Sequence, residues 1–314
     1  MTTRLREENT REPAPVIPDR PNPVLGLGPE DLPAMGKAAE AQASGAHRRY
    51  LRLMRAQIVL PLVGVAIGGL ERDDVPLLGV VAAVATACMV VLRLIQRSSE
   101  VEHSWYDARA AGEEIKSLAW RYAALGSPFV GDGHPDEADD QFVSELAKVA
   151  ERWDLLAPPD ASDEITDAMR ALRAAAAADR RAAYLQERVV DQIEWYSASS
   201  LRDDTLARRW DLAFYVLAGL AVVAGIAIGN TRQVNVAVAS TLGLAAAGAG
   251  AVIAWVGIRR YASLSHSYSS AAKQLSLSAV RAHNCDTDAE WVTLVDEIER
   301  VIARENTHWW TARR

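Results

Sequence analysis

The sequence predicts an all-α membrane protein with two transmembrane helical hairpins, four spans in total, and long cytosolic helical extensions. Three observations predict this fold. Four stretches carry almost no charged residues, they form two pairs joined by short polar turns, and arginines gather at one end of each stretch. Crossing the hydrocarbon core of a bilayer takes about 20 apolar residues, which these stretches reach when interfacial side chains extend them.

The N-terminal segment, residues 1–45, is predicted to be a disordered tail rich in proline and charged residues. Residues 1–33 contain no apolar run of the kind found in a secretory signal peptide. A chain of this composition cannot bury enough apolar surface to offset the entropy lost on ordering. A docking motif inside the tail is an open alternative.

The predicted spans lie in pairs, and the turns that join them are Glu71–Asp74 and Asn230–Gln233. The apolar runs lack the polar stripe that a surface helix of a soluble protein shows. Burial in the core of a soluble protein is the alternative explanation, but the paired arrangement and the hydropathy favour a membrane. We therefore predict spans at residues 51–70, 75–95, 211–229 and 234–258.

Arginines predict the orientation of these spans. They precede the first and third spans and follow the second and fourth, whereas each short turn holds a single arginine. Because short loops rich in Lys and Arg stay in the cytoplasm, we expect a multi-pass protein of the inner (plasma) membrane with both termini cytoplasmic. The flanking residues are Arg48, Arg49, Arg52, Arg55, Arg93, Arg97, Arg202, Arg208, Arg209, Arg259 and Arg260.

Small residues are frequent within the spans and include two pairs at GxxxG spacing. Lipid offers no hydrophobic drive for helix association, so small residues allow close backbone approach. They either pack the four helices together or form an oligomer seam: Gly64, Gly68, Gly225, Gly229, Ala247 and Gly250. No acid or base lies inside the uncharged runs, so a conducting path would be lined by small and hydroxyl-bearing residues. The candidates are Thr86, Asn235, Ser240 and Thr241, with Gly243 for close packing.

The cytosolic segments are predicted to be mostly helical. Helices are expected at about residues 92–124, 140–156, 259–282 and 287–305, and one long helix from about residue 162 into the third span. Residues 131–140 are predicted to form an acidic loop. Several aromatic, charged and polar side chains on these helices are candidates for helix packing or gating: Trp105, Arg109, Glu113, Lys116, Trp120, Gln192, Trp195, Tyr196 and Trp291.

The two halves of the chain follow the same order of elements. His103-Ser104-Trp105 after the second span matches His266-Ser267-Tyr268 after the fourth. This order predicts two tandem units, at residues 46–157 and 158–314, each with one hairpin.

The residues that flank the hairpins resemble the signatures of SLATT domains. The segment from Trp105 to Lys116, followed by Trp120-Arg121-Tyr122, resembles the signature that follows the hairpin in these domains. Glu187-Arg188, the run Asp191–Tyr196, Glu290-Trp291 and Trp309 resemble a second SLATT subtype. The resemblance implies a two-helix membrane effector of prokaryotic conflict systems, often associated with nucleotide-producing or nucleotide-sensing partners. Such effectors are thought to make pores that kill or arrest an infected cell.

Other classes of function find no motif in this sequence. A phosphate-binding loop, a zinc-protease helix, a CxxC pair and a nucleophile elbow are all missing, so we predict no enzyme, cofactor or metal. The net charge of −7 argues against a general nucleic-acid binder. We predict a homo-oligomeric pore whose partners are the lipid bilayer, further copies of the chain, ions and an unidentified cytosolic ligand or sensor. A non-conducting scaffold that recruits a cytosolic partner is the alternative, and a transporter built from repeats is a weaker one.

Overall fold

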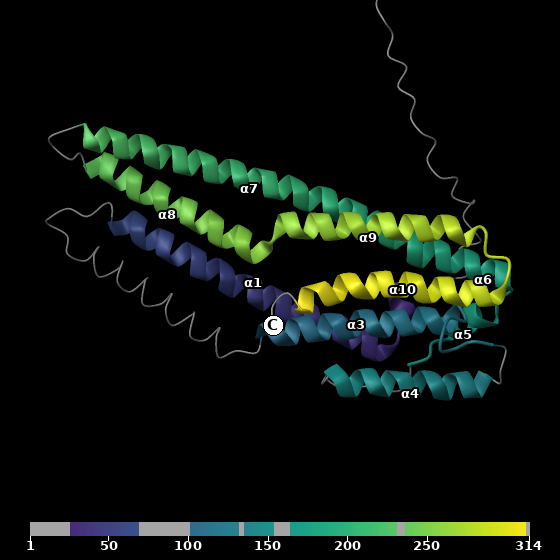
Figure 1. Ribbon diagram of the computed structural model, residues 1–314. Coiled ribbons are helices and arrows are strands. Elements are labelled where there is room, and N and C mark those ends of the chain that lie inside the picture. The colour runs from purple at the N-terminus through teal and green to yellow at the C-terminus, as the bar shows by residue number, and fades with distance from the viewer. Residues whose placement is uncertain (1–25, 69–100, 132–134, 154–163, 231–235, 312–314) are drawn as a thin grey trace, which may run out of the picture.

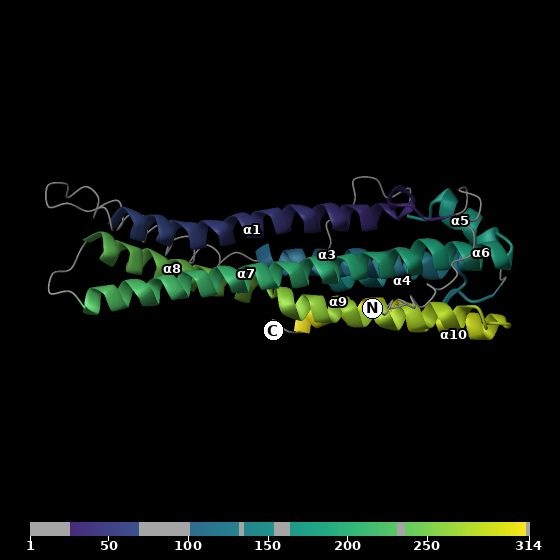
Figure 2. The same cartoon turned by 90° about the horizontal axis from the view of Figure 1, so that it is seen from above.

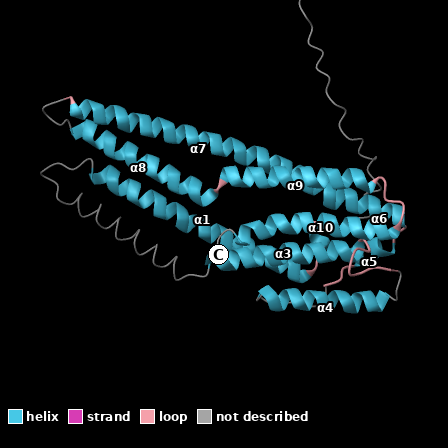
Figure 3. Cartoon of the chain, viewed as in Figure 1, coloured by secondary structure: helices cyan, strands magenta, loops and turns pink. Residues whose placement is uncertain are grey.

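The computed structural model describes residues 26–68, 101–131, 135–153, 164–230 and 236–311 (Figure 1). Helices and the loops between them make up this part of the chain, and it contains no strand (Figure 3). Three helical stretches are long and apolar enough to cross a membrane: Ala34–Ile67, Ala177–Gly229 and Val236–Ala282. These findings confirm the prediction of an all-helical fold and give three candidate membrane-spanning helices. The predicted span at residues 75–95 lies outside the described residues.

Helix α1 (Ala34–Gly68) follows a single 3-10 turn, η1 (Pro29–Asp31). It begins inside the segment that we predicted to be a disordered tail, so that prediction is wrong for residues 34–45. The reason is composition, because this part is rich in alanine and contains no proline, which favours helix. Residues 1–25 lie outside the described part of the chain.

Helices α3 (Val101–Ala123) and α4 (Pro135–Trp153) follow. The chain leaves α3 through Leu125, which has a positive φ of 57°, and the Gly126 amide donates to the carbonyl of Arg121 at 2.8 Å. Most of the acidic segment that we predicted to be a loop is the start of α4. A proline at the first helical position and acidic side chains in the first turn both favour a helix N-terminus, which explains the difference.

The chain then forms α5 (Asp167–Ala174), α6 (Ala177–Ala183), the π-helical turn η2 (Tyr184–Val190) and α7 (Asp191–Gly229). The predicted uninterrupted helix is broken at Ala175, whose backbone is extended. The guanidinium of Arg180 donates to the Ala175 carbonyl at 2.7 Å, so this carbonyl has a hydrogen-bond partner although the helix is broken there. From Ala177 onward the helix continues to Gly229, as predicted.

Helices α8 (Val236–Arg259), α9 (Tyr261–Ala282) and α10 (Asp288–Thr311) complete the chain. Arg260 has a left-handed backbone conformation with φ 51° and separates α8 from α9. The predicted interruption near residues 283–286 is confirmed. Thr287 and Glu290 form a capping box there, in which the Thr287 hydroxyl accepts from the Glu290 amide at 3.2 Å and the Glu290 carboxylate accepts from the Thr287 amide at 3.0 Å.

The molecule is elongated and has two distinct ends (Figures 1 and 2). The apolar parts of α1, α7 and α8 gather at one end, and α7 lies along α8 there. Helices α3, α4, α5, α6, α9 and α10 gather at the other end, together with the first turns of α7. This second group contains most of the buried aromatic side chains. It consists of segments that the sequence predicts to be cytosolic, and we call it the cytosolic bundle after that prediction.

Candidate functional site

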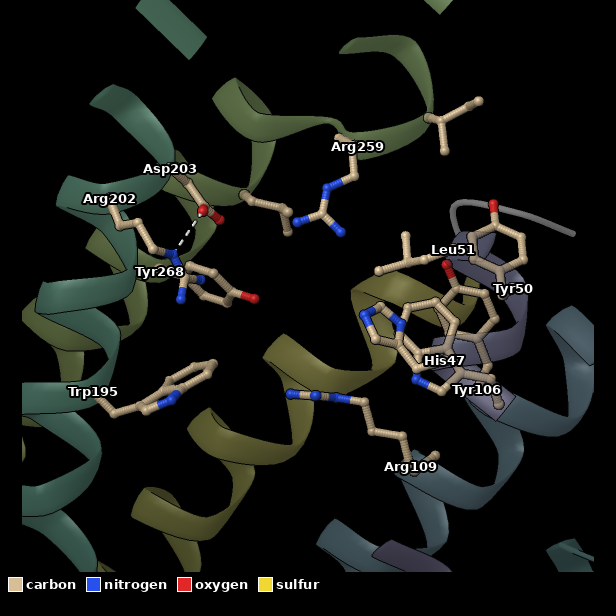
Figure 4. A pocket seen from close by; sticks show the side chains of 14 residues that line it. His47, Tyr50, Leu51, Tyr106, Arg109, Trp195, Arg202, Asp203, Arg259 and Tyr268 are labelled. Carbon is tan, nitrogen blue, oxygen red and sulfur yellow. Dashed lines mark hydrogen bonds and ion pairs between the residues drawn. The ribbon is translucent and has the colours of Figure 1, made fainter. Parts of the chain in front are cut away.

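A cavity of about 200 Å³ lies where the apolar ends of the helices meet the cytosolic bundle (Figure 4). Five helices line it: α1, α3, α7, α8 and α9. Leu51 and Ile258, at the edges of the predicted first and fourth spans, contribute apolar rims. The cavity therefore sits at the junction between the bundle and the predicted spans.

Aromatic side chains form two facing walls of this junction cavity (Figure 4). On one side the Trp105 ring stacks on Tyr50, with 5.9 Å between ring centroids, and lies 4.5 Å from the His47 ring. On the other side the Trp195 ring meets the edge of Tyr268 at 5.2 Å. These contacts hold the walls in place because aromatic pairs with centroids 4.5–7 Å apart attract one another.

Three arginines and one aspartate supply the charges of the cavity. Arg202 donates to the Asp203 carboxylate at 3.2 Å, so this pair is satisfied within α7. Arg109 from α3 and Arg259 from α8 direct their side chains into the cavity (Figure 4). Neither of these two guanidiniums forms an ion pair with any residue that the structure describes. The cavity therefore carries excess positive charge.

His47 lies in α1 ahead of the predicted first span and faces the same two arginines. Its Nδ1 atom is buried and finds no hydrogen-bond partner among the described residues. Burial, and then the positive charges of Arg259 and Arg109, lower the pKa of the His47 imidazole. The neutral ring that this favours can accept or donate one hydrogen bond to a molecule in the cavity.

The cytosolic residues singled out from the sequence separate into two groups. Trp105, Arg109 and Trp195 line the junction cavity. Trp120, Tyr196 and Trp291 are instead buried in the core of the bundle, where Trp291 donates to the Ala124 carbonyl at 2.9 Å. Glu113, Lys116 and Gln192 are half-buried, and Glu113 lines a second hollow on α3.

A buried ion pair in the bundle was not found by sequence reasoning. Arg188 donates to both carboxylate oxygens of Glu299, at 3.1 and 2.8 Å, and the Tyr184 hydroxyl donates to one of them at 3.0 Å. Burial alone would raise the pKa of the Glu299 carboxyl, but the Arg188 charge and hydrogen bonds from Arg188 and Ser117 hold it below its ordinary value. The pair connects η2 to α10, and its partners are too far apart in sequence for any local pattern to signal it.

The residues predicted for the spans lie in different surroundings. Gly64 is buried, and a Cβ added at Gly243 would come within 4.0 Å of Val65 across the contact between α8 and α1. Ser240 is half-buried, and the Thr241 hydroxyl donates to the Ala237 carbonyl at 2.8 Å. Thr86 and Asn235 lie outside the described residues.

Several of the other small residues in the spans do not contact a neighbouring helix among the described residues. A Cβ added at Gly225, Gly229 or Gly250 would meet nothing within 4 Å, so these glycines form no close contact with the residues that the structure describes. Ala247 is half-buried, and Gly68 ends α1. Gly248, which sequence reasoning missed, forms the close contact between α7 and α8, where an added Cβ would come within 3.2 Å of Leu217.

Two family models match the sequence, and together they cover most of the chain. Residues 33–181 match the model of the SMODS and SLOG-associating 2TM effector domain 3, and residues 184–309 match that of the SMODS and SLOG-associating 2TM effector domain 1. Searches of the curated proteins and of the solved structures found no match. Within the described residues, no group of three or more His, Cys, Asp or Glu side chains could hold a metal ion.

Proposed function

The chain belongs to the SLATT family, of which it carries two tandem domains, and from this premise we propose that it is a homo-oligomeric, pore-forming membrane effector. Its pore is gated through the cytosolic helices. The activity is non-enzymatic and serves bacterial defence or stress signalling.

We propose four spans arranged as two hairpins. The family name describes a two-transmembrane unit, and two such units in tandem give four spans. The apolar parts of α7 and α8 lie side by side, which supports the second hairpin. The first hairpin of this proposal combines α1 with the span that the sequence predicts at residues 75–95. The arginines at the span ends support an orientation in which both termini and the cytosolic bundle lie on the inner side of the plasma membrane.

Several copies of the chain surround the proposed pore. Four helices leave little room for a water-filled lumen, and the apolar parts of α7 and α8 expose large side chains such as Val216, Val223 and Ile253. These surfaces face lipid or a second copy. Gly225, Gly229 and Gly250 are open to such a neighbour, since no described residue would lie within 4 Å of a Cβ added there. Ser240 and Thr241 are the described candidates for the pore lining.

One observation carries the gating mechanism: α7 runs from the cytosolic bundle into the third span without a break. Its 39 residues correspond to about 58 Å, roughly twice the thickness of the hydrocarbon core. A continuous helix transmits a tilt or rotation along its length. The connection from α8 to α9 differs, because Arg260 interrupts it with a left-handed residue. Movement of α7 against α9 would therefore open or close the pore.

A disulfide lock tests this mechanism. The Ser200 hydroxyl on α7 donates to the Ser265 carbonyl on α9 at 2.9 Å, and the two hydroxyl oxygens lie 3.3 Å apart. In a chain whose two native cysteines are replaced, the pair Ser200→Cys and Ser265→Cys would fix α7 to α9. We expect planar-bilayer recordings to show wild-type conductance with a reductant and altered open probability after oxidation. Each single variant, treated in the same way, is the control.

A pore-lining variant separates a pore from a scaffold. Ser240→Leu should change the single-channel conductance, whereas Val236→Leu, which keeps an exposed apolar position apolar, should not. A non-conducting scaffold that recruits a partner through the bundle would tolerate both changes. Wild-type protein that conducts under none of the tested voltages and ligands would overturn the pore.

A further inference from the structure

The junction cavity has the composition of a binding site for a small anion with an apolar substituent. Its excess positive charge comes from Arg109 and Arg259, which enter from different helices and carry no ion pair within the described residues. Holding two such cations near each other without a counter-charge is unfavourable. A bound anion between them would relieve that repulsion.

The imidazole of His47 also lines the cavity and adds a hydrogen-bonding group to the two guanidiniums. His47 lies beside Trp105 at the wall that faces the two arginines (Figure 4). A neutral imidazole and two guanidiniums together offer hydrogen-bond donors from three directions, an arrangement that matches the several oxygens of a phosphate group.

The opposite wall suits the remainder of such a molecule. Trp195 lines the cavity and is 43% exposed, and its ring meets that of Tyr268 there. An exposed indole next to a tyrosine ring provides a flat apolar surface for a sugar, a glycerol or a base. The cavity volume of about 200 Å³ is smaller than the roughly 300–1,000 Å³ of sites for drug-sized ligands. It therefore has room for one phosphate and its nearest substituent.

We propose that the junction cavity binds a phosphate ester, with the phosphate between Arg109 and Arg259 and the substituent against Trp195 and Tyr268. The ester comes either from the headgroup of an anionic lipid or from a soluble phosphorylated metabolite. Leu51 and Ile258 place the cavity at the edge of the predicted spans, where both sources have access. The role of this ligand in gating rests on the proposed function, but its binding does not.

The location explains how such a ligand would act. It would contact α1, α3, α7, α8 and α9 at once, so its binding would fix the angle between the bundle and the spans. A ligand shifts a conformational equilibrium only by its difference in affinity for the two states. Here the difference would arise because the two arginines come together only when α3 and α8 are in the arrangement described.

Binding is measured on the full-length purified protein with two probes. One is adenosine 5′-monophosphate, titrated calorimetrically into protein in an uncharged detergent. The other is the count of phosphatidylglycerol molecules retained by the protein in native mass spectrometry, after extraction from mixed phosphatidylglycerol–phosphatidylcholine vesicles. Arg109→Gln and Arg259→Gln should each weaken binding of the active probe by about tenfold or more, the loss typical of one charge-assisted hydrogen bond.

The control is Arg300→Gln, which removes the same charge from an exposed site on α10. It should bind as the wild type does. Far-UV circular dichroism and gel filtration show whether each variant is folded. If Arg109→Gln does not fold, Arg109→Lys takes its place. This variant keeps the positive charge and should retain part of the wild-type affinity. Retention of phosphatidylglycerol alone identifies a lipid headgroup, and binding of the nucleotide alone identifies a soluble ligand.

Two results would overturn the proposal. One is wild-type protein that binds neither probe at millimolar concentration, and the other is binding that Arg109→Gln and Arg259→Gln leave unchanged. Planar-bilayer recordings of the same samples separate this proposal from the pore. Binding without conductance refutes the pore and leaves the site intact, whereas conductance without binding refutes the site alone.

Discussion

The cytosolic bundle buries large aromatic and aliphatic side chains, whereas the apolar ends of α7 and α8 bury only small ones. Trp120, Tyr184 and Phe142 are almost fully buried in the bundle. Along the apolar ends the buried side chains are Ala224, Ala245, Ala249 and Val252. The large side chains there, among them Leu212, Tyr215 and Val222, are exposed.

This contrast separates two ways of stabilising a helix. The bundle has a closed core of its own, of the kind that removes apolar surface from water in a soluble protein. The apolar ends leave their largest side chains uncovered within a single chain, so a surrounding lipid phase or a second copy must cover them. The same kind of substitution should therefore destabilise the two regions to different extents.

The largest expected effect is in the bundle, at the buried pair of Arg188 and Glu299. Both side chains are at most 1% exposed, so Glu299→Ala would leave the guanidinium buried without its counter-charge. Breaking a buried pair in this way costs about 3–5 kcal/mol. We expect that loss in the free energy of unfolding, measured by denaturant titration in detergent. Arg300→Gln, at an exposed pair on the same helix, should cost about 0.5 kcal/mol or less.

The same substitution should change how stability depends on pH. The pKa of Glu299 is lowered in the folded chain, so its contribution is complete above its ordinary pKa near 4.5 and is lost as the pH falls below that value. Unfolding free energy measured between pH 6 and the onset of acid unfolding should fall less steeply in Glu299→Ala than in the wild type. Equal slopes would contradict the ion pair.

A matched pair of leucines sharpens the contrast. Leu275 on α9 is fully buried, so Leu275→Ala should cost about 2–5 kcal/mol because it leaves a cavity. Leu212 on α7 is 64% exposed, so Leu212→Ala in the monomer should cost about 0.5 kcal/mol or less. Thermal unfolding in detergent compares the two. A large loss for Leu212→Ala would show that another copy covers this face.

Much of this arrangement was predictable, because local chemistry marks it. The long apolar helices follow from hydropathy, and the break between α9 and α10 follows from the polar residues 283–286. The start of α4 carried a signal as well, since Pro135 followed by acidic residues is typical of a helix N-terminus.

The cavity could be predicted only in part, because its walls come from five helices. Trp105 and Arg109 were recognised from their four-residue spacing and Trp195 from the resemblance to a SLATT subtype, but nothing in the sequence placed His47 or Arg259 beside them. The contact between Arg188 and Glu299 could not be predicted for the same reason, since it joins positions 111 residues apart in the sequence. The break at Ala175 lies in a run of alanines, where no side chain marks the end of a helix.

A matched pair of charge substitutions tests which apolar surface lies in lipid. Val222 on α7 and Leu277 on α9 are similarly exposed, at 61% and 68%. Val222→Arg would place a charge in the proposed third span, at a cost of about 2.5–3.5 kcal/mol for membrane insertion. Leu277→Arg lies in the bundle and should cost about 0.5 kcal/mol or less. The fraction of chain that resists carbonate extraction from membranes should fall only for Val222→Arg, and equal behaviour would contradict the proposed topology.

The smallest expected effect is at the start of α10. The Thr287 hydroxyl accepts from the Glu290 amide, so Thr287→Ala removes half of the capping box and should cost about 1 kcal/mol. Thr293→Ala is the control, because its hydroxyl only donates to the Ala289 carbonyl within the helix. Hydrogen exchange should become faster at the first turn of α10 in Thr287→Ala alone. Unchanged exchange there would mean that packing of Trp291, and not the cap, fixes the beginning of this helix.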